Sequence, residues 1–317
     1  SIRYLRCSYE REGAENYNMI SYSFVNYEDC ESEEEFQETV KKWTYRTKRV
    51  SWPSDYTMFT GLTRIDTTDA VWLSLRKFSP DSRITYIDTD DSLDTISQVL
   101  NPENIKVMHI GIMGTDLKGI GQYKNLEELD VDTNLTARSV DINGIEQCKN
   151  LKRLRLRCGE AYEGLENIGS LACLKSLYID QVPIEECTFL RNLPQLEELS
   201  VYTGEEAGLS VLDDLPNLKK VDFLDMNYIP PGEIHRLQGV EELSIAVNET
   251  EGVNEIASLS SLKALELHMA IHEYNAPVDI SVLGTAQGLQ RLWLDNFWGG
   301  RQEQTNRPLL LCKQIIL

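Results

Sequence analysis

Residues 151–158 read LKRLRLRC, a stretch in which apolar and basic side chains alternate. In an extended strand successive side chains point to opposite faces, so the leucines lie on one side and the arginines on the other. The stretch therefore predicts a strand with one buried face and one face in solvent. Its exposed arginines stand out because the chain is acidic, with 51 Asp and Glu residues against 31 Lys and Arg residues.

The same frame recurs along the chain: an apolar residue, two free positions, a second apolar residue, one free position and a third apolar residue. Successive frames are 21–27 residues apart, except for a first step of 17 residues. A repeat of this length predicts stacked coils that bury one apolar side against each other. The frames begin at Ile2, Met19, Val40, Leu62, Ile84, Ile105, Leu126, Leu151, Leu174, Leu196, Leu218, Val240, Leu262 and Leu289.

This frame resembles the leucine-rich repeat family, in the 22-residue class of internalins and some phosphatase regulatory subunits. The resemblance implies an α/β leucine-rich repeat solenoid of about 14 coils, curved like a horseshoe. A single parallel sheet would line its concave face, with 3₁₀ or short helices on the convex side. The family favours Asn at the ninth repeat position, which only Asn134 and Asn248 supply here, so we expect the turns to close their hydrogen bonds differently.

The repeat also predicts the domain organisation. We expect residues 19–295 to form the solenoid, residues 1–18 to form an N-terminal cap or a first irregular repeat, and residues 296–317 to form a C-terminal cap. Thr67 and Thr89 occupy inward positions that the family fills with Leu, which indicates distorted first repeats.

The third, fifth and seventh residues of each repeat are predicted to face solvent on the sheet, beside the same positions of the neighbouring coils. Read this way, the early repeats predict a compact acidic field with Gly111 as a gap. Carboxylates this close repel each other and favour a nearby cation. The acidic field is therefore interpreted as a site for a basic protein partner, as a site for a divalent metal, or as a face that contacts solvent alone. The members of the field are Asp66, Asp88, Asp90, His109, Asp130 and Asp132.

Next to this field, the frame places Arg155 between Asp130 and Tyr178, and Arg157 between Asp132 and Asp180. The arginines are interpreted either as lateral counter-ions or as ligands for a carboxylate or phosphate of a partner. Aromatic side chains supply a second kind of contact, because Tyr and Trp are frequent at the energetic centres of interfaces. Those expected to contact a partner are Tyr178, Tyr202 and Trp293.

Composition limits the function. The net charge of −20 argues against nucleic acid and for a basic partner. No apolar run reaches the roughly 18 residues that span a membrane. Seven cysteines without a CxxC pair argue against a disulfide framework or a zinc site and favour a reducing compartment, so the cytoplasm is expected. An exported, internalin-like adhesin is the alternative if a signal peptide was removed.

Catalytic activity is not expected. The four histidines lie in no arrangement that suggests a catalytic triad, and no phosphate-binding loop is present. A metal-binding or hydrolytic site around His109 is the less favoured alternative, and no cofactor is predicted. The sequence thus predicts a monomeric, non-catalytic protein that binds a basic protein partner, such as an intracellular regulatory, inhibitory or immunity protein.

Overall fold

A computed structural model describes most of the chain, which divides into two compact units, Ser1–Asn167 and Ile168–Leu317. The predictions for Val40 and Thr67 lie outside the described residues. The residues described are 2–12, 16–26, 57, 61–66, 77–79, 81–111, 116–133, 139–157, 161–204, 208–224, 229–270, 278–297 and 315–316.

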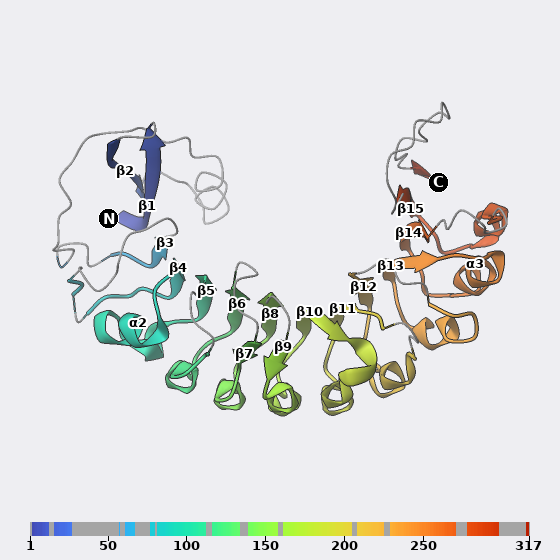
Figure 1. The fold of residues 1–317 in the computed structure, drawn as a ribbon, viewed down its shortest axis with the longest axis horizontal. Coiled ribbons are helices and arrows are strands. Elements are labelled where there is room, and N and C mark those ends of the chain that lie inside the picture. The colour runs from blue at the N-terminus through green and yellow to red at the C-terminus, as the bar shows by residue number, and fades with distance from the viewer. Residues whose placement is uncertain are drawn as a thin grey trace. The chain divides into compact units, whose positions relative to one another are not determined.

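The first unit is built on one sheet, in the order β2, β1, β3, β4, β5, β6, β8, with short helices on one of its faces (Figure 1). A two-stranded sheet of β7 and β9 lies apart from it. The strands are β1 (Ile2–Glu12), β2 (Asn16–Asn26), β3 (Arg64–Asp66), β4 (Tyr86–Thr89), β5 (Val107–Gly111), β6 (Glu128–Asp132), β7 (Ser139–Asp141), β8 (Arg153–Arg157) and β9 (Ala161–Glu163). The helices are α2 (Leu93–Val99), η3 (Pro102–Asn104), η4 (Ile120–Gln122) and η5 (Ile145–Gln147), and η6 (Leu165–Ser170) crosses the boundary between the units.

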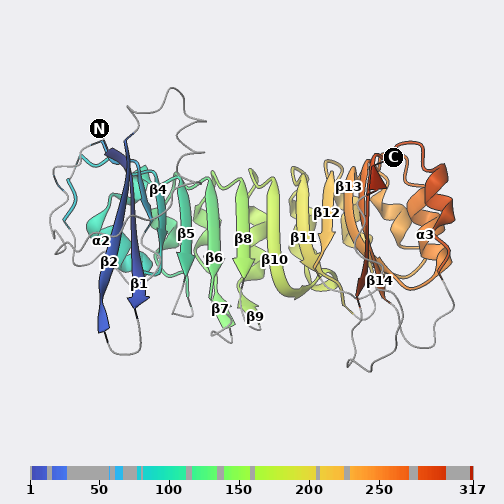
Figure 2. The same cartoon turned by 90° about the horizontal axis from the view of Figure 1, so that it is seen from above.

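The second unit repeats this plan. Strands β10 to β15 pair in parallel in chain order, and β16 pairs antiparallel with β15. Figure 2 shows the strands side by side with helical segments behind them. The strands are β10 (Ser176–Pro183), β11 (Glu198–Tyr202), β12 (Lys220–Phe223), β13 (Glu242–Val247), β14 (Ala264–Ala270), β15 (Arg291–Phe297) and β16 (Ile315–Ile316). The helices are η7 (Ile184–Glu186), η8 (Thr188–Asn192), η9 (Ser210–Asp214), η10 (Ile234–Leu237), α3 (Thr250–Ala257) and η11 (Ser281–Thr285).

Strand register confirms the repeat frame. In the first unit the fifth-position residues are lateral partners from Asp66 through Asp88, His109 and Asp130 to Arg155. The inward residues form the core, and eleven inward leucines and isoleucines from four coils are each at most 2% exposed. These are Leu151, Leu154, Leu156, Leu174, Leu177, Ile179, Leu196, Leu199, Leu262, Leu265 and Leu267.

The frame is wrong at Met19. Its strand, β2, pairs antiparallel with β1, and β1 pairs in parallel directly with β3, so Arg6 lies beside Asp66. Only residues 13–15 separate the two strands, which suits a hairpin, whereas a parallel crossover needs a dozen residues or more. The first step of the repeat frame, only 17 residues long, already indicated that Met19 does not begin a regular coil. The domain boundaries at residues 18 and 295 stay a prediction.

The turns close through asparagines at an unexpected position. The residue just before the first apolar residue of a repeat is Asn in four described coils. Each of these side chains donates from Nδ2 to a backbone carbonyl of the preceding coil, at 2.8–3.0 Å. This arrangement ties neighbouring coils together where ninth-position asparagines are scarce. The pairs are Asn104 with Ser82, Asn125 with Glu103, Asn150 with Lys124, and Asn217 with Pro194.

Thr89 shows how a polar residue fits an inward position. It is fully buried, and its hydroxyl donates to Asp91 Oδ2 and accepts from the Asp91 backbone N–H, both at 3.2 Å. Its polar atom is therefore satisfied locally, and the coil keeps its parallel register with β5. Nowhere in the described part of the chain is there a helix with the length and apolar character needed to cross a membrane.

Candidate partner-binding surface

Five of the six residues of the predicted acidic field lie on or directly after strands β4, β5 and β6 of the first unit. The third-, fifth- and seventh-position residues of these strands carry five carboxylates around one histidine. We call this surface the acidic face. It consists of Asp88, Asp90, His109, Glu128, Asp130 and Asp132, with Tyr86, Val107 and Gly111 between them.

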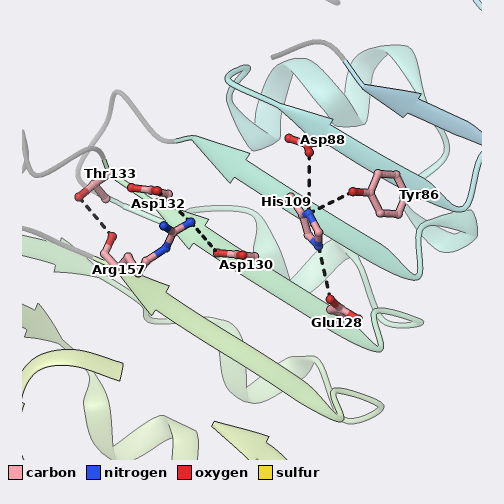
Figure 3. A network of polar contacts seen from close by, with 8 residues as sticks. All are labelled: Tyr86, Asp88, His109, Glu128, Asp130, Asp132, Thr133 and Arg157. Carbon is pink, nitrogen blue, oxygen red and sulfur yellow. Dashed lines mark hydrogen bonds and ion pairs between the residues drawn. The ribbon is translucent and has the colours of Figure 1, made fainter. Parts of the chain in front are cut away.

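His109 lies at the centre of the acidic face and is held from both sides (Figure 3). Its Nδ1 lies 3.1 Å from Tyr86 Oη and 3.8 Å from Asp88 Oδ2, while Nε2 lies 3.4 Å from Glu128 Oε1. The Tyr86 ring meets the imidazole edge-on at 5.2 Å between centroids. Polar partners on both nitrogens fix the ring in place.

These contacts keep His109 charged. Burial alone would lower the pKa of His109, but the Asp88 and Glu128 carboxylates beside its two nitrogens outweigh the effect of burial and raise the pKa to about 9. The same contact with His109 lowers the pKa of Glu128. At neutral pH the acidic face therefore carries an imidazolium at its centre.

Arg157 borders the acidic face as the predicted counter-ion. Its Nη2 lies 2.9 Å from Asp132 Oδ2 and 3.8 Å from Asp130 Oδ1 (Figure 3). Arg155 is the register partner of Asp130. Burial raises the pKa of Asp130, although the charges of Arg157 and Arg155 act in the opposite direction. The expected contacts of these arginines with Tyr178 and Asp180 of the second unit stay predictions.

Two members of the predicted acidic field differ from expectation. Asp66 on β3 is only 7% exposed, so its carboxylate contributes little to the solvent-facing surface. Asp90 is exposed, and its Oδ1 lies so close to Gly111 that it would overlap with a Cβ at that position. Gly111 is therefore not an open gap, because the Asp90 carboxylate fills the space above it.

The sequence prediction left Tyr86 and Glu128 out of this site. Both are third-position residues that reach His109 diagonally from the adjacent strands. Tyr86 also lies under the Arg64 guanidinium, whose central carbon is 3.6 Å from the ring centroid. Reading the third-position row together with the fifth would have found this network, because diagonal neighbours lie within reach of long side chains.

In the second unit, Tyr178 and Tyr202 are half-buried on β10 and β11. Asp180 departs from the frame. It is only 7% exposed, and the register of β10 against β11 shifts between Ile179 and Pro183. Gln181 within this shift has a φ of 60°, a left-handed backbone conformation. The predicted lateral pairing of Asp180 with Tyr202 is therefore wrong, since Tyr202 pairs with Pro183.

Trp293 is half-buried on β15, beside Glu266 of β14. The Arg291 guanidinium lies 5.5 Å from its ring centroid, and Arg291 Nη2 lies 2.8 Å from Glu242 Oε1. That ion pair spans the intervening strand because the residue between the partners is Ala264, which leaves room for it. Trp293 thus has an ordered charged neighbour.

The metal interpretation finds no support in the geometry. Among the described residues, no group of three or more His, Cys, Asp and Glu side chains is arranged to hold a metal ion. The acidic carboxylates lie in lateral rows across β4, β5 and β6, and the nitrogens of His109 already face Tyr86, Asp88 and Glu128.

The parallel register, the repeat length and the leucine core define a leucine-rich repeat solenoid, and the predicted resemblance to that family is confirmed at the level of the fold. No family model matches the chain. The volume-regulated anion channel subunit LRRC8A of rat, mouse and human is 27% identical over 225 residues, which is 67% of this chain. The chain spans 24% of the length of those relatives.

Solved structures of leucine-rich repeat proteins are also similar. One is a leucine-rich repeat protein of Leptospira interrogans, with 18% identity and a TM-score of 0.47 over 75% of this chain and 68% of that one. Another is the internalin InlF of Listeria monocytogenes, with 15% identity and a TM-score of 0.43 over 77% of this chain and 82% of that one.

Proposed function

We propose that this chain is a non-catalytic interaction protein that binds a basic protein partner through the acidic face of its first unit. Stacked repeats present extended surfaces of this kind for protein binding. The observation that carries the proposal is the excess of charge on β4, β5 and β6, where five carboxylates surround a single imidazolium.

Charge complementarity gives this surface its selectivity. A cluster of carboxylates attracts Lys and Arg side chains and repels acidic ones, which favours basic partners and accelerates their encounter. The net charge of −20 extends the same preference over the whole chain. In the second unit, Tyr178, Tyr202 and Trp293 are separate candidates for partner contact, because Tyr and Trp are frequent at the energetic centres of interfaces.

The protonation of His109 argues against a role as a general base. A general base must be unprotonated at the working pH, and a histidine whose pKa is raised to about 9 holds its proton at neutral pH. The neighbouring carboxylates act as its counter-ions. From the net charge of −20 and the seven cysteines without a CxxC pair, we propose a regulatory, inhibitory or immunity protein that works in the cytoplasm.

The test is affinity capture from native lysate with three matched baits. These are the wild type, a face variant with Asp88, Asp130 and Asp132 changed to Asn, and a control variant with Glu166, Glu249 and Glu251 changed to Gln. Both variants lose three negative charges, but the control residues are exposed on or next to helical segments. We expect a basic protein bound by the wild type and the control and lost by the face variant. Equal recovery on all three baits would contradict the proposal.

A further inference from the structure

We propose that His109 is a built-in counter-ion of the acidic face that gives up its proton when a basic partner docks. The inference rests on the proposed function and adds to it a coupling between binding and pH. In this proposal, the protonation state of His109 determines how strongly the acidic face attracts a cation.

The geometry places His109 where an incoming cation must compete with it. Tyr86 and Asp88 face it from β4, and Glu128 and Asp130 face it from β6. Its side chain is 30% exposed, and those of Asp88 and Glu128 are 25% and 35% exposed. The two carboxylates that hold the imidazolium are thus partly exposed to solvent.

Further charged side chains lie one strand further out on each side of His109. On β3, Arg64 lies beyond Tyr86 and Asp66 lies beyond Asp88. On β8, Arg155 lies beyond Asp130. On β5 itself, the residues two positions from His109 are Val107 and Gly111, which carry no charge. Among the described side chains, the imidazolium is therefore the cation at the centre of the acidic face, where a partner's Lys or Arg would pair.

Docking changes the balance that protonates His109. An ammonium or guanidinium that pairs with Asp88 and Glu128 repels the imidazolium and takes over the carboxylates that stabilised it. The pKa of His109 then falls from about 9 toward its ordinary value of 6.5. At pH 8 the ring would change from about nine-tenths protonated to almost fully neutral, and the released proton passes to the buffer.

Proton release links affinity to pH in a defined direction. Because the bound state holds fewer protons than the free state, binding strengthens as the pH rises between about 7 and 9. The limit is about tenfold in affinity per pH unit for one proton released. Carboxylates are already ionised in this range, so they contribute no such slope.

The experiment is calorimetric titration of the full chain with an N-acetylated, C-amidated octa-arginine peptide at pH 8, in HEPES and in Tris. The two buffers take up protons with different enthalpies, so the difference in binding heat counts the protons released. We expect roughly 0.5–0.9 proton per peptide for the wild type, from the fractional protonation above. His109→Gln should release none of them and bind the peptide more tightly at pH 7. The control is His235→Gln, which changes an exposed histidine of η10 and should behave like the wild type.

The outcomes separate the two proposals. Suppose that the wild type and His109→Gln release equal numbers of protons, while an Asp88→Asn/Asp130→Asn variant no longer binds the peptide. That result would overturn the role of His109 and leave the proposed function standing. Peptide binding that this double variant does not weaken would overturn both. If His109→Gln does not fold, the His109 pKa is measured by NMR in the wild type with and without peptide. A pKa that does not fall on peptide addition would overturn the inference.

Discussion

His109 illustrates how a single residue can reduce repulsion within a cluster of like charges. Its contacts at 3.4 and 3.8 Å with Glu128 and Asp88 place positive charge between carboxylates that would otherwise repel each other across the strands. Because the pKa of His109 is raised above its ordinary value of 6.5, the protonated ring stabilises the folded state.

The sign of this contribution predicts a pH dependence of stability. It is fully present below pH 6.5 and is lost as the pH rises through about 9, where the folded-state ring deprotonates. Relative to His109→Gln, the wild type should therefore lose roughly 2–3 kcal/mol of unfolding free energy between pH 6 and pH 10. Urea unfolding at several pH values measures this difference. Parallel curves for the two proteins would show that His109 has no raised pKa.

Arg157 has a different role, because it pairs with the Asp130 carboxylate, whose pKa is raised by burial. Removing the Arg157 charge should raise the pKa of Asp130 further, since the opposing influence is lost. Arg157→Ala should cost only about 1 kcal/mol of stability, because the ion pair is partly exposed. Carboxyl NMR titration measures the Asp130 pKa, with Arg191→Ala as a control on the helical side. An Asp130 pKa that falls or stays unchanged in Arg157→Ala would contradict this assignment.

At the scale of the element, the strands derive their stability from the leucines of their inward faces. Leu199 of β11 is 1% exposed, whereas Ser200, the next residue, lies half-buried on the opposite face. Leu199→Ala should reduce the unfolding free energy by about 2–5 kcal/mol, the usual cost of a cavity left by a buried leucine. Ser200→Ala should change it by less than about 1 kcal/mol. Chemical denaturation measures both, and equal effects would mean that the repeat frame is misassigned.

The register of these strands could be predicted because a strand period of 2 and a nearly constant repeat together fix which residues are neighbours. Both departures occur where the backbone leaves that rule. At Met19 the short connection favours a hairpin, and at Asp180 the strand has a register shift with a left-handed Gln181 beside a carboxylate that is only 7% exposed. The repeat length around Asp180 stays at 22 residues, so the spacing gave no sign of the shift.

The sequence predicted which residues of the candidate site lie side by side on neighbouring strands, but it did not predict their hydrogen bonds. Asp88, His109 and Asp130 follow directly from the frame, and the structure places them side by side. The polar partners on the nitrogens of His109 also include Tyr86 and Glu128, which reach it diagonally from the third position. A row-by-row reading names lateral neighbours, whereas the hydrogen bonds depend on side-chain length and rotamer.

At the scale of the whole molecule, the net charge of −20 and the carboxylates of the acidic face act on the rate of encounter with a partner. Packed aromatic side chains act instead on the lifetime of the bound state, because their contacts form only after docking. The two kinds of residue therefore have separable kinetic signatures.

The most direct test of the account is surface-plasmon kinetics of the captured partner at two salt concentrations. Removing charge at Asp88 and Asp90 should mainly slow association and flatten its salt dependence, whereas Tyr202→Ala should mainly speed dissociation. Unchanged kinetics in both variants, together with loss of binding in Trp293→Ala, would place the binding surface at β15 and contradict the role of the acidic face.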